Sequence, residues 1–185
     1  LPNQPRPTPQ PPPLSWDASL ANSSSVWASQ CLWQHSTSGG AYGENLYASS
    51  AFVITSASLP QAVTAWYNEV SKYTDWTAGF PSNFNEVGHF TQLVWKASTS
   101  MGCGAATCGP SFAIANGVYV VCRFAPAGNM VGAFNLNVLP PIGGSATGFT
   151  STVSTTPAPA PAQSAPDLWG QVLALTNQYR ATHQA

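Results

Sequence analysis

Apolar residues recur at helical spacing in three separate parts of the chain. Asp17 stands where the N-cap of a first helix is expected, and that helix runs to about Cys31, because an Asp side chain accepts hydrogen bonds from the free N–H groups of a first turn. Pro60 fits the first turn of a second helix over 60–73. A third helix is predicted over 167–185, where apolar side chains return at intervals of three and four residues.

The second helix carries a polar residue where its apolar stripe should continue. Four of its residues share one face: Ala62, Trp66, Glu69 and Tyr73. An inward-facing carboxylate needs a partner or a polar cavity, because burying an unpaired charge is costly. The pattern therefore predicts that Glu69 belongs to a polar site inside the fold.

Three segments are predicted to be strands: 89–96 (HFTQLVWK) because its apolar and polar residues alternate, 117–124 (GVYVVCRF) because it is rich in β-branched and aromatic residues, and 101–108 on a weaker pattern. Two helices followed by three strands favour an α+β domain in which helices are layered on an antiparallel sheet.

Composition divides the chain into four parts. Residues 1–13 are rich in proline and predict an extended arm. Residues 14–138 hold the four cysteines and nearly all aromatic residues, and form the globular body. Residues 139–166, rich in Pro, Ala, Ser, Thr and Gly, are typical of a linker. The helix over 167–185 follows, with Asp167 in position to cap its start.

The chain carries little charge. Five Lys+Arg and six Asp+Glu in 185 residues give a net charge of −1 and 6% charged residues, against about 25% in an average globular protein. Five dispersed cations form no basic patch, which argues against nucleic-acid binding. No apolar run approaches the roughly 20 residues of a membrane span. The opening LPNQPRPTPQ has no apolar stretch, so we expect no signal peptide within this sequence.

Four cysteines in a Ser- and Thr-rich chain of low charge favour two disulfides and an oxidising compartment. Two alternatives are four reduced, buried thiols and a zinc site that uses Cys103 and Cys108. The zinc alternative is weaker because the sequence has no C-x-x-C pair. Asn22 begins the sequon Asn-Ser-Ser, a candidate N-glycosylation site that is consistent with secretion.

Acid–base and metal chemistry in the body falls mainly to two histidines and two glutamates. These residues are His35, Glu44, Glu69 and His89. Imidazole and carboxylate together are suitable ligands for a zinc or copper ion. The same four side chains could instead form a hydrogen-bonded cluster without metal, and their spacing along the chain does not by itself bring them together.

Five segments resemble motifs of the CAP superfamily, which comprises cysteine-rich secretory proteins, antigen-5 allergens and plant pathogenesis-related-1 proteins. GHFTQLVWKAST (88–99) and VYVVCRFAPAGNM (118–130) resemble its two signatures, with Phe where the second usually has Tyr. GENL (43–46), AWYNEVSKY (65–73) and TNQYRATH (176–183) resemble its pre-strand, central-helix and first-helix motifs. The stretch GFPSNFNEVGHFTQLVWKASTSMGCG is similar in particular to fungal members, including the sterol-exporting proteins of yeast.

The resemblance implies a three-layer α-β-α sandwich with a central antiparallel sheet. It also implies that His35, Glu44, Glu69 and His89 form the cavity tetrad of the family, in which the two histidines bind zinc. The inward position predicted for Glu69 agrees with this assignment.

The resemblance implies a disulfide pairing as well. Cys31 would pair with Cys103 and tie a helix to the sheet. Cys108 would pair with Cys122 and join two neighbouring strands.

The order of the motifs departs from the family. There the first-helix motif directly precedes a segment like PPLSWD, whereas here TNQYRATHQA ends the sequence and PPPLSWDASLA lies near its start. We therefore predict a circular permutation that places the first helix after the 139–166 linker. Two alternatives remain: the helix begins a second, truncated CAP domain, or it docks into a neighbouring molecule as a domain-swapped dimer.

The segment 73–90 contains turn residues but more aromatic residues than a solvated loop needs. These are Tyr73, Trp76, Phe80, Phe84 and Phe90. In sterol-binding relatives the corresponding loop lines the lipid pocket. The resemblance therefore implies a secreted protein, extracellular or at the cell wall, that binds a sterol or a fatty acid and acts in lipid export, defence or virulence.

A second candidate function is metal-dependent hydrolysis, such as proteolysis. A zinc-bound water held by His35 and His89, with Glu44 or Glu69 as the base, would provide the nucleophile. A serine hydrolase is less well supported, because no G-x-S-x-G motif occurs and Ser36 has only the adjacent His35 as a candidate base.

A third candidate function is a cell-wall-associated interaction module. It would bind wall polymers through the Pro-rich segments 1–13 or 139–166, which carry no candidate catalytic chemistry.

Overall fold

The computed structural model describes residues 12–37, 39–50, 53–55, 58–142 and 168–183. In chain order the elements are β1 (Ser15–Trp16), α1 (Ala18–Ser29), β2 (Gly43–Ser49), α2 (Ser58–Asn68), the 3-10 helix η1 (Glu69–Lys72), α3 (Phe84–Val94), β3 (Ser100–Thr107), β4 (Val118–Ala125), α4 (Phe134–Asn137) and α5 (Leu168–Ala181). Most of the predicted arm at 1–13 and linker at 139–166, and the predicted cap Asp167, lie outside the described residues.

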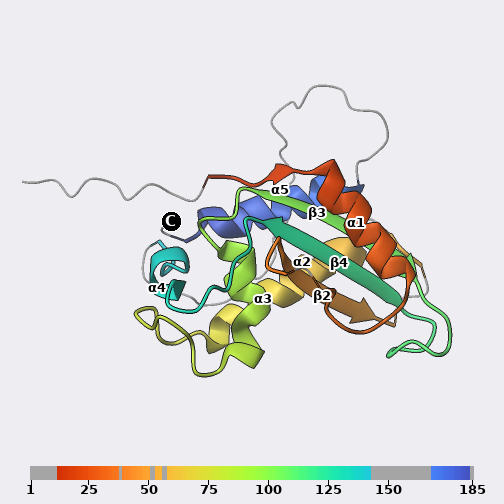
Figure 1. The fold of residues 1–185 in the computed structure, drawn as a ribbon, viewed down its shortest axis with the longest axis horizontal. Coiled ribbons are helices and arrows are strands. Elements are labelled where there is room, and N and C mark those ends of the chain that lie inside the picture. The colour runs from red at the N-terminus through yellow and green to blue at the C-terminus, as the bar shows by residue number, and fades with distance from the viewer. Residues whose placement is uncertain (1–11, 38, 51–52, 56–57, 143–167, 184–185) are drawn as a thin grey trace, which may run out of the picture.

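The four strands form one sheet in the order β1-β3-β4-β2 (Figure 1). β2 and β3 both pair antiparallel with β4, whereas β1 pairs parallel with β3. The sheet is therefore mixed, not wholly antiparallel as predicted, because a strand of two residues is too short to show an alternating pattern in the sequence. β4 is buried along almost its whole length, which explains its uninterrupted run of β-branched and aromatic residues.

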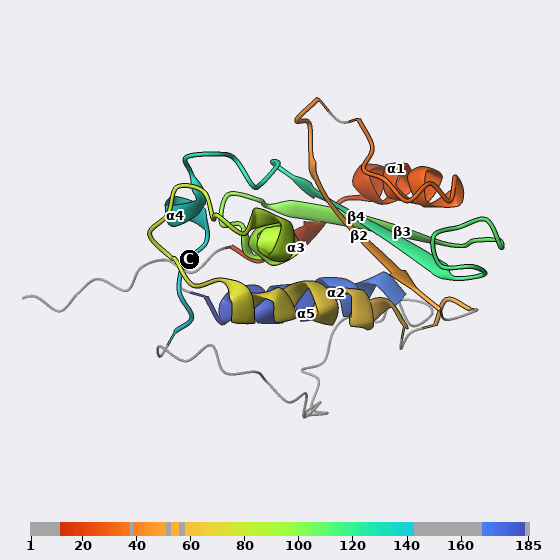
Figure 2. The ribbon, with the colours of Figure 1, turned by 90° about the horizontal axis from the view of Figure 1, so that it is seen from below.

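Helices cover both faces of the sheet, so the fold is the predicted three-layer α-β-α sandwich. α1 lies on one face, and α2, α3 and α5 lie on the other (Figure 2). Two glycines of β3 let α1 approach closely: a Cβ on Gly102 would collide with the backbone of Ala21, and one on Gly104 with that of Ser25. The missing side chains therefore set the distance between this helix and the sheet.

The main hydrophobic core lies between the sheet and the three helices α2, α3 and α5, and includes Trp66, Phe90 and Trp95. A smaller cluster, which includes Ala28 and Tyr119, lies between the sheet and α1. In the part of the chain that the structure describes, no helix combines the length and apolar character needed to cross a bilayer.

Asp17 caps α1 as predicted, with its Oδ1 accepting the N–H groups of Ser19 (2.8 Å) and Leu20 (3.1 Å). The predicted helix over 60–73 is present as α2 followed by η1.

The predicted strand at 89–96 is wrong, because most of this segment belongs to helix α3. The buried residues of α3 include Val87, Phe90 and Val94. They recur at intervals of three and four residues, which is the helical period. The alternation of HFTQLVWK arises because the helix is buried on more than one side, so apolar residues also occupy positions outside this stripe.

The two disulfides join Cys31 to Cys108 and Cys103 to Cys122. Two disulfides are confirmed, but the pairing that the resemblance implied is wrong. Cys103 and Cys122 are direct neighbours across β3 and β4, with Cα atoms 4.1 Å apart. Cys31 follows α1 and Cys108 follows β3, with Cα atoms 5.6 Å apart. The register between β3 and β4, which the sequence alone does not show, decides the pairing.

Helix α5 packs beside α2 within the same chain (Figure 2). The Asn177 side chain accepts the backbone N–H of Leu14 (2.7 Å) and donates to the carbonyl of the same residue (3.0 Å). The ring of Tyr179 stacks on that of Tyr67, with centroids 3.9 Å apart. These contacts join the C-terminal helix to both the N-terminal segment and the body.

Arg180 anchors α5 in the core. Its guanidinium is buried and donates to four backbone carbonyls, those of Pro12, Leu93, Trp95 and Ser98. Burial lowers the pKa of Arg180 to about 10, so the group remains charged at neutral pH. Carbonyl dipoles therefore provide the partners for this cation.

His183 is buried just after α5. Its Nδ1 lies 2.8 Å from the carbonyl of Leu139, and its Nε2 lies 3.1 Å from the hydroxyl of Tyr67. Burial lowers the pKa of His183 and so favours the neutral ring. The hydrogen bond to the Leu139 carbonyl acts in the opposite direction but is the smaller effect. Ile142 also pairs its N–H with the carbonyl of Thr182, so the first residues of the predicted linker pack against the helix.

Candidate functional site

Two histidine–carboxylate pairs lie at one cavity beside the sheet. Nδ1 of His35, in the loop after α1, is 3.0 Å from Oε1 of Glu44 on β2. Nδ1 of His89, on α3, is 2.7 Å from Oε1 of Glu69 at the start of η1. The structure thus forms two pairs from the four predicted residues, and three of the four line a cavity of about 230 Å³.

The walls of this cavity combine three of the predicted residues with others. The lining residues are His35, Glu44, Asn45, Phe84, Asn85, Gly88, His89 and Asn129. Glu69 is not among them, because it lies behind His89. Asn45 and Asn129 were not expected from the sequence, since amides of this kind occur in many loops and strands.

Glu69 holds helix α3 in position as well as the imidazole. Its Oε2 accepts the backbone N–H groups of His89 and Phe90, both at 3.0 Å. The indole of Trp66 stacks on the imidazole of His89, with centroids 6.3 Å apart. The predicted inward carboxylate therefore has three donors, which offset the cost of burying it.

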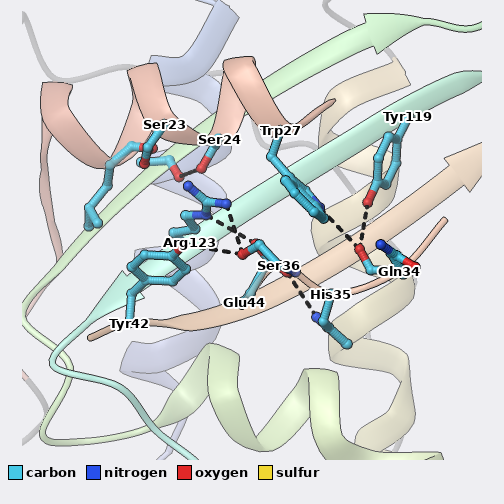
Figure 3. A network of polar contacts seen from close by, with 12 residues as sticks. Ser23, Ser24, Trp27, Gln34, His35, Ser36, Tyr42, Glu44, Tyr119 and Arg123 are labelled. Atoms are coloured by element: carbon cyan, nitrogen blue, oxygen red, sulfur yellow. Dashed lines mark hydrogen bonds and ion pairs between the residues drawn. The ribbon is translucent and has the colours of Figure 1, made fainter. Parts of the chain in front are cut away.

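Glu44 accepts hydrogen bonds from three residues (Figure 3). Its Oε1 accepts from His35 and from the backbone N–H of Ser36 (2.9 Å). Its Oε2 accepts from the hydroxyl of Ser36 (2.7 Å) and from Nε of Arg123 (3.0 Å). Arg123 also donates to the Ser36 hydroxyl (2.9 Å) and lies 4.3 Å from the ring centroid of Tyr42.

This network sets the charge state of Glu44. Burial by itself would raise the pKa of its carboxyl, but the hydrogen bonds from His35, Ser36 and Arg123 outweigh burial and lower the pKa to about 2. Glu44 is therefore ionised at every physiological pH. It keeps His35 oriented and balances the buried charge of Arg123.

A second, more open groove lies on the other side of the same network. It has a volume of about 480 Å³ and runs beside α1. Its lining residues are Asn22, Ser23, Val26, Trp27, Ser36, Thr37, Tyr42 and Arg123. The Glu44–Arg123 pair thus lies between the groove and the histidine cavity, a role for Arg123 that the sequence did not reveal because solvated arginines are common.

The contacts of Ser36 do not form a nucleophile–base pair. Its hydroxyl hydrogen-bonds to Glu44, Tyr42 and Arg123, and the nearby Nδ1 of His35 bonds to Glu44 instead. A hydroxyl beside a guanidinium and a carboxylate has no imidazole to take its proton. The geometry therefore gives no support to a serine hydrolase.

The donor set fits a metal only through the two imidazoles. Each Nδ1 is held by a carboxylate, which leaves each Nε2 as the metal-binding atom, and carboxylate–imidazole pairs of this kind commonly support bound metals. Among the described residues no three His, Cys, Asp or Glu side chains are grouped to hold a metal ion. His35 and His89 could therefore hold zinc only weakly, with water in the remaining positions.

The five aromatic residues of the predicted lipid loop lie at different depths. Tyr73 and Phe90 are buried in the main core, and Trp76 packs partly buried against both rings. Phe80 is exposed, and Phe84 is half-buried at the wall of the histidine cavity. The aromatic side chains of this segment therefore extend from the core to the surface, and one of them, Phe84, lines the histidine cavity.

Asn22 of the predicted sequon is exposed on α1 at the rim of the open groove. Ser24, the third residue of the sequon, is buried and donates its hydroxyl to the carbonyl of Gly102 (3.0 Å). Glycosylation of Asn22 stays a prediction.

Comparison with known proteins places this geometry in a family. Residues 3–124 match the family model described as CAP, the cysteine-rich secretory protein family. The chain belongs to this family. The matched segment ends before α5, so the assignment of the C-terminal helix depends on its motif and packing.

The relatives include fungal, animal and plant proteins. The chain is 38% identical over 129 residues to Protein PRY2 of Saccharomyces cerevisiae, covering 69% of this chain and 35% of that protein. It is 36% identical over 138 residues to Venom allergen 3 of Solenopsis invicta, covering 68% and 58%. A solved structure of NaASP2 with Zn2+ superposes with a TM-score of 0.59 at 30% identity, covering 66% of this chain and 65% of that one. The chain thus spans between about a third and three fifths of the length of these two curated relatives.

We expect Glu44→Gln to lower the free energy of unfolding by about 3 kcal/mol at pH 7, because it leaves the buried Arg123 without its counter-charge. The pKa of Glu44 is lowered from 4.5 to about 2, so its stabilising contribution is complete above pH 4.5 and is lost as the pH falls towards 2. Urea unfolding should therefore show a steeper loss of stability between pH 5 and pH 2 in the parent than in the variant.

The matched control is Glu86→Gln. Glu86 forms an exposed ion pair with Lys72, so its removal should leave stability at pH 7 nearly unchanged. If the two variants unfold alike, Glu44 does not have the structural role assigned to it.

Proposed function

We propose that this protein is secreted and binds a sterol or a fatty acid outside the cell. Two disulfides and membership of the CAP family support an extracellular location. The observation that carries the lipid-binding proposal is a buried hydroxyl without a partner in the aromatic segment.

That hydroxyl belongs to Tyr73. The residue is only 3% exposed, and among the described residues its Oη has no hydrogen-bond partner. Burial, with a smaller contribution from Asp75, raises the pKa of Tyr73 to about 12, so the group is a neutral donor at physiological pH. An unpaired buried hydroxyl costs about 1–3 kcal/mol, and the hydroxyl of a sterol or the carboxylate of a fatty acid would supply the missing partner.

The surrounding rings suit the apolar part of such a ligand. The rings of Trp76 and Tyr73 meet edge to face with centroids 4.8 Å apart, and those of Phe80 and Phe84 lie 5.2 Å apart further towards the surface. Flat hydrocarbon rings gain favourable contacts against aromatic faces. Ligand entry would require the 74–83 loop to move, since Trp76 packs on the core rings in this structure.

We expect Tyr73→Phe to weaken cholesterol or fatty-acid binding about fivefold to tenfold, since it removes one hydrogen bond, without loss of stability in the free protein. Phe80→Ala combined with Phe84→Ala should abolish saturable binding. A binding assay with radiolabelled cholesterol and palmitate measures both effects. Tyr47→Phe on β2 is the matched control and should bind like the parent; if no sterol or fatty acid binds the parent, the proposal fails.

We also propose that His35 and His89 bind a divalent metal such as zinc through their Nε2 atoms. The carboxylate behind each ring supports this role. Two protein ligands make a weak site, which would stabilise the cavity rather than provide catalysis. The solved structure of NaASP2 with Zn2+ concerns a relative and is consistent with this proposal.

Zinc should bind with a stoichiometry of one ion per chain, and His35→Ala or His89→Ala should each abolish binding. Affinity should fall as the solution is made more acidic, because protons compete with the metal for the Nε2 atoms. Isothermal titration calorimetry measures both effects, with Glu86→Gln as the control. Zinc binding that persists in both histidine variants would contradict the assignment, and zinc-dependent turnover lost in His89→Ala would favour a hydrolase instead.

We further propose that α5 is the first helix of the family, placed at the C-terminal side by circular permutation. Its docking in the same chain through Asn177 and Arg180 supports this order, and so does the motif TNQYRATH.

A chain in which residues 168–185 are moved in front of residue 12, with 143–167 removed, should keep the disulfide pairs and the unfolding midpoint of the parent. The reason is that every contact of α5 with the body can form in either order. Size-exclusion chromatography and thermal unfolding at several concentrations provide the measurement. A reordered chain that fails to fold, or a parent whose midpoint rises with concentration as in a swapped dimer, would contradict the permutation.

A further inference from the structure

An uncharged apolar lobe lies at one end of the molecule. It consists of residues 76–85 and 129–137, and we call it the end lobe. In both views the 77–83 loop and α4 lie side by side at the end opposite the turn between β3 and β4 (Figures 1 and 2). Four of its large apolar side chains are exposed: Phe80, Met130, Val131 and Leu136.

These side chains point outward because the interior of the lobe is already filled. The buried ring of Phe134 contacts Phe80, Phe84 and Trp95, with centroids 5.4, 6.0 and 5.1 Å away. Val131 and Leu136 remain outside this packed interior, at 79% and 67% exposed.

The two halves of the lobe are joined through their glycines. The N–H of Gly132 donates to the carbonyl of Gly79 (2.8 Å). Gly132 has a φ of +87°, a conformation that favours glycine. The exposed side chains of both segments are therefore held together as one surface.

The charge pattern indicates which partner suits this surface. Neither segment of the end lobe contains Asp, Glu, Lys or Arg. The nearest flanking acids are engaged: Asp75 accepts from Thr77, and Glu86 pairs with Lys72. The side chains of the lobe can thus enter an apolar phase without desolvating a charge of their own. Lys96 lies beside the lobe, with its backbone N–H donating to the Asn137 carbonyl (3.0 Å), but neither segment itself carries a cation that would attract anionic headgroups.

We propose that the end lobe docks on the surface of an electrically neutral lipid bilayer and inserts Met130, Val131 and Leu136 among the acyl chains. This inference rests on the proposed lipid-binding function, because Phe80 and Phe84 belong to both the lobe and the ligand-binding segment. Docking at this end brings those rings to the membrane from which a sterol or fatty acid is taken. A protein partner is less well supported, since the exposed side chains lie on loops and the one-turn helix α4 and carry no charge to specify a complement.

The docking test uses flotation of the full chain with phosphatidylcholine vesicles. The parent should float with the vesicles, and neither higher salt nor added phosphatidylserine should change the bound fraction by more than about twofold. Val131→Asp combined with Leu136→Asp should reduce partitioning at least tenfold, because each change places a charge in the acyl region. Both side chains are exposed, so the variant should keep the unfolding midpoint of the parent.

The chain offers a matched control in Val26→Asp combined with Leu32→Asp. Val26 and Leu32 are also exposed, at 56% and 46%, but Val26 lies on α1 and Leu32 just after it. Like the lobe variant, the control replaces one valine and one leucine by aspartate, so the added charge is the same. This control should float like the parent. A parent that stays in solution, a lobe variant that floats undiminished, or a control that loses as much binding as the lobe variant would overturn the proposal.

A parallel assay with cholesterol delivered from cyclodextrin separates docking from ligand binding. If the lobe variant binds cholesterol from cyclodextrin but does not float, docking and ligand binding are both supported as separate properties. If the parent binds cholesterol but does not float, docking fails while the proposed function stands. If the parent floats but binds no sterol or fatty acid, the proposed function fails, and docking is a property of the lobe alone.

Discussion

The buried ion pair between Glu44 and Arg123 is the contact on which the candidate site depends. The two residues are direct neighbours across β2 and β4, so the register of the sheet brings their charges together. A buried pair repays its desolvation only if further hydrogen bonds satisfy the remaining donors and acceptors. Ser36 and His35 supply those bonds, and in doing so the loop after α1 becomes attached to the sheet.

The other acidic residues that the structure describes also have defined partners. Each acidic residue there has a defined partner: Asp17 caps α1, Glu44 pairs with Arg123, Glu69 holds α3, Asp75 forms a turn, and Glu86 pairs with Lys72. A chain with so few charges uses them at helix ends, turns and the histidine cavity. Large parts of the remaining surface are consequently uncharged, and the end lobe is the clearest example.

Helix α5 completes the opposite layer by a different kind of contact. Arg180 enters the core with backbone carbonyls as its partners, and Asn177 pairs with both backbone groups of Leu14. The carbonyls of Leu93 and Trp95 near the end of α3, and that of Leu14 before β1, thereby gain a side-chain donor. The helix therefore provides hydrogen bonds as well as apolar contacts, which explains how a segment far from the body in sequence can be an integral part of the fold.

Patterns within the sequence were enough to predict α1, α2, α5, the central strands β3 and β4, and the presence of two disulfides. The family motifs pointed to His35, Glu44, Glu69 and His89 as a group. These features depend on residues that are close together in the chain. Asp17 was recognised as a helix cap, Glu69 by its place on the apolar face of a helix, and β4 by its β-branched and aromatic residues. Tertiary structure decided what depends on register and on contacts between distant segments. The register of β3 with β4 chose the disulfide pairs, two-sided burial made α3 look like a strand, and only the folded chain placed Arg123 behind Glu44 and left the hydroxyl of Tyr73 without a partner.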